Sequence, residues 1–599
     1  PIGFRCVAQI NNIQRPSAYV YLEELPLSPN GKLDRKTLPA PENAHTESVT
    51  YVPPRTPAEE SLCAIIADVL NVAKVGGNDN FFALGGDSIL AIQVVSRARS
   101  AGLQLTPHDL FRAQTVAELA LCAVEQVSQE EADAEEEGDI VPLTPIQRWF
   151  FTTQPEERHH FNQSVLLRPA GVIDPEAIRW ALQELVSRHA ALRLRFSADG
   201  QEQSVAPFAE VPLDVINLRN ASETDWLRAV EEYCGKLQSC LDIATGPLMR
   251  ACYFQGPDHA GNRLFLVCHH LAVDSVSWRI LVDDLERLLR ARSCGKEPEL
   301  APVTVSFPRW ARELCALADS PDTLAEAEYW EHQLGASLAL SLPGDTDAGA
   351  PFDVSGSLNE EETERLLHGI HESFHTGVQD ILVAALTLTL ARLDGLQEHS
   401  VMLESHGRGA LDEYDLAHTV GWLTSLYPLR LTLPKGEDIL ALVKETKERL
   451  RRVPRQGIGY GLLRFVSEDA HALVLRSLPA APVCFNYLGQ INTDDASLFT
   501  LADEPVGLPT SPSRRPPYAL EWNGAIRGGC LHFVVSCDPV RVTPDAACRF
   551  ARAYEGAVRE ILTCCESDAV GGYTPSDFAL ANLDQNELDD LLSDINDDD

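Results

Sequence analysis

The sequence predicts a multidomain protein whose largest unit has α/β architecture. Its 599 residues are too many for a single hydrophobic core. Three breaks in composition divide the chain: residues 39–56 are rich in Pro, Ser and Thr, residues 128–139 form an acidic run, and residues 573–599 leave the globular pattern and end in an acidic tail. After the second break, helical stretches such as 175–189 alternate with short apolar runs such as 264–268, which indicates helices layered on sheets. The alternation recurs on both sides of residue 350, as expected for a duplicated arrangement.

These breaks predict six segments along the chain. The first residue, Pro1, falls in what reads as the middle of a domain, so we expect the chain to be a piece of a longer protein. The segments are a small α+β remnant at 1–40, a linker at 41–55, a small helical domain at 56–127, an acidic linker at 128–139, the α/β domain at 140–566 and a C-terminal segment at 567–599.

Composition excludes several classes of function. The formal net charge of −39 argues against nucleic acid or an anionic membrane as a partner. No apolar run is long enough to span a membrane, and no signal peptide is visible, so a cytoplasmic location is expected. The 15 cysteines are scattered and contain no CxxC pair, which predicts reduced thiols rather than disulfides or a zinc site.

Capping signals define the helices of the small domain. Thr56-Pro57-Ala58-Glu59 and Thr115-Val116-Ala117-Glu118 both have the form of a capping box. Between them, in "FFALGGDSIL" (81–90), Ser88 opens a helix with an apolar stripe. Its hydroxyl lies at the positive end of the helix dipole, where an attached phosphate is stabilised. The alternative is an ordinary N-cap serine.

A second polar cluster follows an apolar strand in "LFLVCHHLAVDSVSW" (264–278). His269 and His270 point to opposite faces, because side chains alternate along a strand. Three interpretations stay open on spacing alone: two core histidines with local partners, a metal site with Asp274 as a third ligand, or a catalytic histidine.

The small helical domain resembles the peptidyl carrier protein of nonribosomal peptide synthetases. In that family the serine of an LGG(H/D)S motif carries 4′-phosphopantetheine, which would fall on Ser88 and requires a phosphopantetheinyl transferase. The resemblance implies a four-helix bundle. The form Asp87-Ser88-Ile89 resembles carriers that precede epimerization domains.

Upstream, "LPLSPNGKLDRKTLP" (25–39) resembles the last motif of adenylation domains in the same synthetases. Lys32 would then match the lysine that holds the acyl-adenylate, whereas a solvated loop lysine is the alternative. Only the end of the C-terminal subdomain is represented, so the resemblance implies an upstream adenylation core as partner.

The HHxxxD pattern resembles the chloramphenicol-acetyltransferase-like condensation superfamily, a pseudo-dimer of two α/β lobes. This implies that His270 reaches the active site, while His269 and Asp274 brace the fold, the latter through an ion pair with an arginine and without metal. Arg408 is expected to be a supporting residue of the site. Five further segments resemble family motifs in order: "PLTPIQRWFF" (142–151), "ESHGRG" (404–409), "HTVGWLTSLYP" (418–428), "RQGIGYG" (455–461) and "PVCFNYLGQ" (482–490). The chain departs from the family at Ser275, Ser405 and Gly409, where glycine, glycine and glutamate are usual.

Within that superfamily the resemblance favours an epimerization domain. "VSWRIL" (276–281) and "FNYLGQ" resemble epimerization domains, which invert Cα of a carrier-bound aminoacyl or peptidyl thioester. The alternatives are a condensation domain that forms a peptide bond and an inactive docking platform for the carrier. Inversion needs a base on one face of the carbon and an acid on the other.

His270 and Glu404 are the predicted acid–base pair, facing each other across the thioester. Asn486 and Tyr487 are candidates for positioning the substrate, with a strand-end hydrogen bond and a core aromatic as the alternatives. Glu404 could instead be a surface carboxylate.

The acidic C-terminal segment carries a leucine stripe. It resembles the communication segments that dock onto a downstream synthetase, and a linker to a further domain is the alternative. The stripe consists of Leu583, Leu588, Leu591, Leu592 and Ile595.

Overall fold

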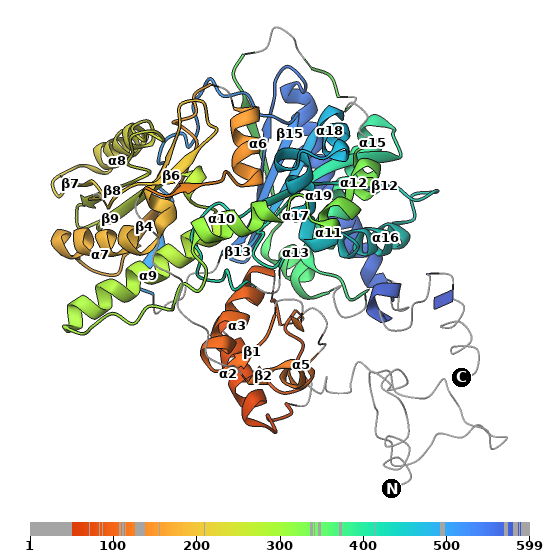
Figure 1. Ribbon diagram of the computed structural model, residues 1–599, viewed down its shortest axis with the longest axis horizontal. Coiled ribbons are helices and arrows are strands. Elements are labelled where there is room, and N and C mark those ends of the chain that lie inside the picture. Colours follow the sequence, from red (N-terminus) through yellow and green to blue (C-terminus); the bar gives the residue numbers. More distant parts are fainter. Residues whose placement is uncertain are drawn as a thin grey trace.

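The computed structural model contains a small helical unit and two α/β lobes (Figure 1). It describes residues 51–70, 72–82, 84–86, 88–106, 109–110, 113, 115–125, 138–154, 156–208, 210–335, 340, 342–344, 349–369, 374–411, 414–491, 497–567, 573–578, 585 and 587–588. The predicted remnant at 1–40 with Lys32, most of the acidic linker and most of the C-terminal segment lie outside the described residues.

The helical unit contains α2 (Pro57–Leu70), α3 (Ser88–Ser100) and α5 (Val116–Cys122), with a short sheet of β1 (Leu103–Gln104) and β2 (Val124–Glu125). The predicted starts are confirmed, since the hydroxyls of Thr56 and Thr115 accept hydrogen bonds from the backbone N–H groups of Glu59 and Glu118. The helices share a core of apolar residues that includes Leu62, Ile66, Val94 and Leu119. Three helices are present among the described residues of this unit, so the expected four-helix bundle stays a prediction.

The first lobe is built on a five-stranded sheet in the order β14-β4-β9-β8-β7. Alternate residues of β9 pack on opposite faces, because Phe265 and Val267 contact the core under α8 while Leu264 and Leu266 belong to the main core. This explains why the strand is apolar throughout. The strands are β4 (Asn162–Pro169), β7 (Leu213–Asn217), β8 (Met249–Gln255), β9 (Arg263–His269) and β14 (Phe499–Leu501); the helices are α7 (Pro175–Arg188), α8 (Glu223–Gln238) and α9 (Ser275–Cys294).

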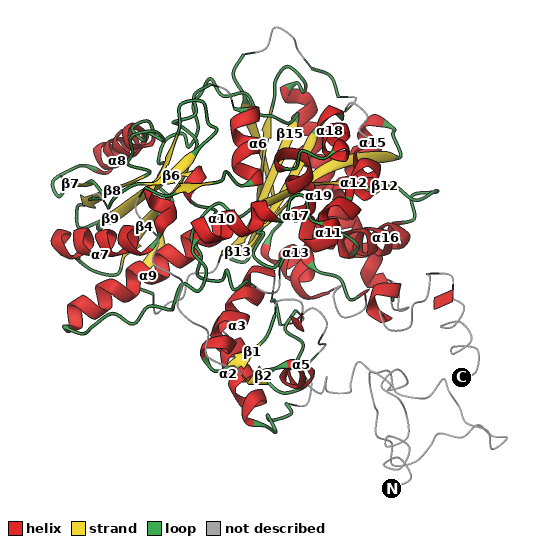
Figure 2. Cartoon of the chain, viewed as in Figure 1, coloured by secondary structure: helices red, strands yellow, loops and turns green. Residues whose placement is uncertain are grey.

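The second lobe is built on a six-stranded sheet in the order β10-β16-β15-β13-β11-β12. Figure 2 shows strands of this sheet among the helices of the lobe. Three strands in the middle, β11, β13 and β15, run parallel, with Leu403 paired to Phe485 and Phe485 to Trp522. Trp522 packs on Tyr554 of α19, so this row of side chains faces the helical layer. The strands are β10 (Phe352–Ser357), β11 (Glu398–Ser405), β12 (Ser425–Thr432), β13 (Val483–Ile491), β15 (Leu520–Arg527) and β16 (Cys530–Cys537); the main helices are α15 (Val378–Asp394), α16 (Ile439–Arg451) and α19 (Pro544–Ser567).

The two lobes are not separated cleanly at residue 350. Strand β14 belongs to the second half of the chain, yet it pairs with β4 and completes the first lobe's sheet. The remaining elements are a small sheet of β3 (Ile140–Val141), β5 (Leu194–Phe196) and β6 (Gln203–Val205), and the helices α6 (Pro145–Thr153), α10 (Phe307–Ala316), α11 (Pro321–Ala325), α12 (Ala327–Leu334), α13 (Glu360–Glu364), α17 (Ile458–Gly461) and α18 (Ala470–Ser477).

Part of the predicted C-terminal segment packs against the second lobe. Asp577 forms an ion pair of 2.5 Å with Lys447 of α16, whose side chain is fully buried. Of the leucine stripe, Leu588 lies in the described part of the chain and is buried. In that same part, no helix is long and apolar enough to cross a membrane.

Candidate active site

The two histidines at the end of β9 face different surroundings. Nε2 of His269 lies 2.7 Å from the carbonyl oxygen of Arg158, and Nδ1 accepts a hydrogen bond of 3.2 Å from the backbone N–H of Leu271. Burial lowers the pKa of His269 to about 3, so this ring is neutral. Both ring nitrogens have backbone partners, so His269 stabilises the turn after β9.

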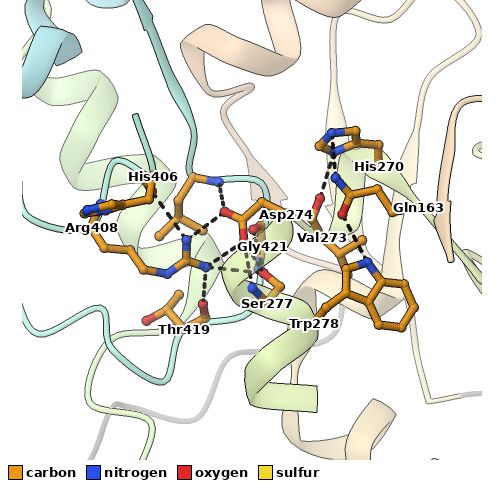
Figure 3. A network of polar contacts seen from close by, with 11 residues as sticks. Gln163, His270, Val273, Asp274, Ser277, Trp278, His406, Arg408, Thr419 and Gly421 are labelled. Carbon is orange, nitrogen blue, oxygen red and sulfur yellow. Dashed lines mark hydrogen bonds and ion pairs between the residues drawn. The ribbon is translucent and has the colours of Figure 1, made fainter. Parts of the chain in front are cut away.

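His270 begins the short helical turn that follows β9. Nδ1 lies 2.8 Å from the carbonyl oxygen of Val273, and Nε2 lies 3.0 Å from Nε2 of Gln163 (Figure 3). A carbonyl only accepts, so Nδ1 carries the proton and Nε2 the lone pair. The ring stacks on Phe161 and contacts Trp422 at a centroid distance of 4.2 Å. Burial lowers the pKa of His270, which favours the neutral ring.

Asp274 forms an ion pair with an arginine, as the resemblance implied, and this arginine is Arg408. The guanidinium donates two hydrogen bonds, 2.7 Å to Oδ2 and 3.0 Å to Oδ1, and both side chains are buried (Figure 3). The backbone N–H groups of Ser277 and Leu423 also donate to the carboxylate. Burial would raise the pKa of Asp274, but Arg408 and these donors hold it below its usual value. A metal-ligand role for Asp274 is therefore wrong, because both oxygens are already engaged.

The departure at Ser275 has a local explanation. Ser275 is the first residue of α9, and Asp274 caps this helix, so the backbone at Ser275 is right-handed and helical. A glycine's conformational freedom is not required there.

Glu404 lies near the end of β11 in the second lobe. The thiol of Cys484 contacts Oε1 at 3.9 Å. Burial, together with the negative charge of Glu521, raises the pKa of Glu404 to about 7. At neutral pH this carboxyl group can therefore both give and take a proton.

Glu521 is a residue that sequence reasoning missed. It lies on β15 directly beside Cys484, which in turn pairs with Met402 on β11. These side chains share the face opposite Leu403, Phe485 and Trp522, and Glu404 lies two residues along from Met402 on that face. The sequence signal for Glu521 is a carboxylate within the largely apolar run "YALEWNG" (518–524). Charged side chains are rare in such runs, so this carboxylate could have been recognised as a candidate site residue.

A row of aromatic side chains extends from His270 to Tyr518. Trp422 contacts His270, Trp149 lies edge-on to Trp422 at 6.3 Å, and Tyr518 stacks on Trp149 at 6.4 Å. Burial raises the pKa of Tyr518, and the acidic groups of Cys484, Glu521 and Glu404 add to this effect. His270 thus contacts one end of this row, and the charge of Glu404 acts on Tyr518 at the other end. Among the described residues no hydrogen bond or ion pair links His270 and Glu404 directly.

A pocket that opens to solvent lies beside this row. Its lining includes Trp149 and Trp422, and also Leu426, which pairs with Glu404 across β11 and β12. Neither His270 nor Glu404 lines it, so it adjoins the candidate site without containing it.

Asn486 and Tyr487 are divided between the two faces of the second sheet. Leu403 pairs with Phe485, so the next residues, Glu404 and Asn486, lie at the same level and on the same face. The amide of Asn486 donates a hydrogen bond of 3.2 Å to Asn523. Tyr487 falls on the opposite face and packs against the core.

Polar contacts join the helical unit to the larger domain. Gln490 of β13 donates a hydrogen bond of 2.8 Å to the carbonyl of Gly85, and Arg99 of α3 lies 3.3 Å from the carboxylate of Asp415. Ser88 is the first residue of the 13-residue helix α3. The first contact brings the loop before Ser88 to the end of β13, four residues beyond Asn486.

This helix start fits a phosphate-linked prosthetic group. Gly85 has φ 94°, and a Cβ on Gly86 would lie 2.4 Å from the ring of Phe81, so both glycines let the loop turn tightly before the helix. The positive end of α3 stabilises a phosphate on its first residue, Ser88.

Comparisons with known proteins agree with this arrangement. Residues 60–123 match the phosphopantetheine attachment site family, and residues 137–571 match the condensation domain family. The chain is thus a carrier domain followed by a condensation-type domain.

Relatives similar over nearly the whole chain are subunits of nonribosomal peptide synthetases. The chain is 39% identical to chondramide synthase cmdD of Chondromyces crocatus over 96% of its own length, which is 15% of that protein. It is 35% identical to tyrocidine synthase 1 of Brevibacillus parabrevis, again over 96% of its length, and spans 54% of that protein. The chain therefore spans less than two thirds of the length of these relatives.

Solved structures share the two-lobed fold. The crystal structure of the epimerization domain from the third module of tyrocidine synthetase B is 30% identical, with a TM-score of 0.67 over 73% of this chain and 100% of that domain. The SgcC5 protein of Streptomyces globisporus is 18% identical, with a TM-score of 0.58 over 71% of this chain and 99% of that one, so it shows the fold alone.

The chain therefore belongs to the condensation-domain family of nonribosomal peptide synthetases.

Proposed function

We propose that the domain at 140–566 inverts the Cα of an aminoacyl or peptidyl thioester, supplying a D-configured residue for nonribosomal peptide synthesis. The observation that carries the proposal is a pair of titratable groups with oppositely shifted pKa values: His270 contacts one end of the aromatic row, and Glu404 acts electrostatically on Tyr518 at the other end. The pKa of His270 is lowered, so its ring is a neutral base at neutral pH, and the pKa of Glu404 is raised to about 7, so its carboxyl group can give or take a proton there.

His270 serves as one acid–base group. Its Nε2 carries the lone pair, and the protonated Nδ1 is held by Val273. The ring can therefore accept the Cα proton at Nε2 and return it there.

Glu404 serves as the second group on the opposite face of the carbon. In its protonated form it donates to Cα, and in its ionised form it removes the proton, so the two residues exchange roles for the two enantiomers. Asn486, beside Glu404 on the same face, is positioned to hydrogen-bond the thioester carbonyl, whose oxygen gains negative charge when Cα loses its proton. Tyr487 supports the strand from the core side.

Ser88 is the attachment point for 4′-phosphopantetheine, which supplies a flexible arm and an activating thioester when present. Tethering makes delivery intramolecular, so a weakly binding site sees a high local concentration of substrate. This assignment implies a phosphopantetheinyl transferase, an upstream adenylation core and a downstream synthetase as partners.

A condensation domain is the second candidate function, and the two-lobed fold shared with the condensation family favours it. It would use the same histidine to form an amide bond and would need a second, amine-bearing substrate. A silent docking platform for the carrier is the third.

The test loads Ser88 with an L-aminoacyl pantetheine and incubates the full chain in heavy water. Epimerization predicts deuterium at Cα and a drift toward mixed chirality, detected by mass spectrometry and chiral chromatography after thioester cleavage. The Ser88→Ala chain, which cannot be loaded, gives the background. An unlabelled L product from the loaded chain would reject the proposal in favour of condensation or docking.

A further inference from the structure

A glutamine contacts Nε2 of His270, the ring nitrogen that carries the lone pair. Gln163 lies on β4 opposite Cys268 of β9, one residue before the two histidines. Its Nε2 is 3.0 Å from Nε2 of His270, and its Oε1 is 3.0 Å from Nε1 of Trp278 on α9 (Figure 3). The three side chains form one row: indole, amide, imidazole.

The indole fixes the direction of this row. A tryptophan N–H only donates, so the atom of Gln163 that faces Trp278 is the oxygen, and the NH2 group faces His270. An amide N–H donates to Nε2 only when that nitrogen carries a lone pair. The carbonyl of Val273 demands the proton at Nδ1, so both ends of the ring select the same neutral tautomer.

Protonation of Nε2 places two donors against each other. Gln163 cannot relieve this by rotating its amide, because its NH2 group would then face the N–H of Trp278. The hydrogen bond to Gln163 must therefore break when His270 takes up a proton, and the amide stays with Trp278.

We propose that Gln163, oriented by Trp278, is a positioning residue that holds His270 as the neutral base with its lone pair on Nε2 and disfavours retention of the proton there. This inference deepens the proposed function, on which it rests for the use made of the base. The Cα–H bond breaks as the proton moves to Nε2, and the same proton or one from the opposite group returns to Cα.

The charged groups around His270 act on its pKa but do not select its tautomer. Burial has the largest effect and lowers the pKa; Asp274 on its own loop raises it, and Arg514 from the loop before β15 lowers it. Arg514 lies over the ring of Phe161, which stacks on His270, and His269 from the same strand is neutral. Among the described contacts, none from these groups reaches Nε2.

The test measures ¹⁵N chemical shifts of histidine rings in the full chain, with His270 among the 17 histidines identified from the His270→Gln spectrum. The wild type should show neutral His270 with the proton on Nδ1. Trp278→Phe frees the amide to turn its oxygen toward Nε2, and the pKa of His270 should rise by about one unit. Gln163→Glu, which is isosteric, places an acceptor beside Nε2 and should raise it by about two units.

Gln163→Leu completes the set, since it removes the donor without adding an acceptor and should give a smaller rise than either change. The buried His269 signal at its wild-type position shows that each variant keeps the fold. A wild-type proton on Nε2, or an unchanged His270 pKa in all three variants, would overturn the inference. Neither readout needs turnover, so a failure of the proposed epimerization would appear separately, as absence of deuterium in a chain with the expected tautomer.

Discussion

The two halves of the candidate site prepare their titrating groups in different ways. In the first lobe, both ring nitrogens of His270 have a hydrogen-bond partner and the neighbouring loop is fixed by the Asp274–Arg408 ion pair. In the second lobe, Glu404 has one weak thiol contact at 3.9 Å and another partly buried carboxylate, Glu521, near it. The first lobe thus orients the base His270 through hydrogen bonds. The second lobe raises the pKa of Glu404 because it offers this carboxyl group few hydrogen-bond donors.

The difference follows from where each residue lies in the fold. His270 leaves its strand into a turn, where backbone carbonyls are free to accept. Glu404 is still within β11, where the backbone groups pair with β12 and β13 and leave little to solvate a side chain. Burial therefore shifts the pKa of each group in favour of its neutral form, and only His270 also gains a defined tautomer.

The largest expected effect is on turnover. His270→Gln and Glu404→Gln should each lower the rate of Cα deuterium exchange by about 10²- to 10⁴-fold, because each removes one general acid–base group. The rate is measured on the loaded full chain in heavy water.

Matched controls are available for both changes. Glu398→Gln lies on the same strand as Glu404, in a partly exposed ion pair with Arg430, and His471→Gln removes an exposed histidine. Both controls should keep near-wild-type exchange. If Glu398→Gln lowered the exchange rate as much as Glu404→Gln, the loss would come from a disturbed strand β11 and not from removal of the acid.

The next prediction compares how substitutions in the two lobes change the free energy of unfolding. Arg408→Ala leaves the buried carboxylate of Asp274 without its main partner and should cost about 3–5 kcal/mol of unfolding free energy. Glu404→Gln removes no strong contact and should not lower the unfolding free energy at neutral pH, because the uncharged amide avoids ionising a carboxyl group whose pKa is raised in the folded state. Urea unfolding, monitored by tryptophan fluorescence, measures both free energies. Similar losses in the two variants would contradict the proposed difference between the strongly paired first lobe and the weakly contacted Glu404.

A third prediction uses pH, which should act with opposite sign in the two regions. The pKa of Glu404 is raised from 4.5 to about 7 on folding, so its contribution to stability is present below pH 4.5 and is lost as pH rises through 7. The pKa of His270 is lowered from 6.5, so its contribution is present above 6.5 and is lost as pH falls.

Thermal unfolding between about pH 5 and pH 8 tests this pair of signs. Relative to Glu404→Gln, the wild type should lose stability as pH rises; relative to His270→Gln, it should lose stability as pH falls. Differences of the same sign would contradict the opposed burial effects.

Sequence reasoning found the parts of the site that are close together in the chain. His269, His270 and Asp274 lie within six residues, so spacing alone brought them to one turn, and the resemblance supplied Arg408 and Glu404. Sequence reasoning missed three further residues, Gln163, Trp422 and Glu521, because their positions depend on strand pairing and on the contact between lobes.

The distances along the chain explain this limit. Gln163 is 107 residues from His270, and its side chain in "FNQSVLL" (161–167) has the ordinary polarity of an alternating strand. The return of β14 to the first sheet was likewise invisible, since its three residues carry no distinctive pattern. Site residues that are close together in the sequence could be predicted, whereas the pairing of strands that are far apart in the sequence could not.

The smallest effect concerns the carrier, which contacts both regions. Arg99 pairs with Asp415, which follows the loop of Arg408 on the His270 side, and Gly85 accepts from Gln490 on β13, the strand of Asn486. Arg99→Asp and Asp415→Arg should each slow exchange on the tethered substrate by about three- to tenfold, and the double swap should restore most of the rate. Gln490→Ala, which removes the hydrogen bond to Gly85, should slow it less.

Exchange on a free aminoacyl-pantetheine thioester provides the control, because that substrate does not need the carrier to dock. All four variants should leave this untethered rate unchanged. If Gln490→Ala were the more harmful change, docking would depend on the Glu404 side of the domain, and the fixed loop around Arg408 would serve His270 alone. If the swap restores the rate, the ion pair that braces His270 and the ion pair that docks the carrier share one loop, so the more rigid half of the site also receives the substrate.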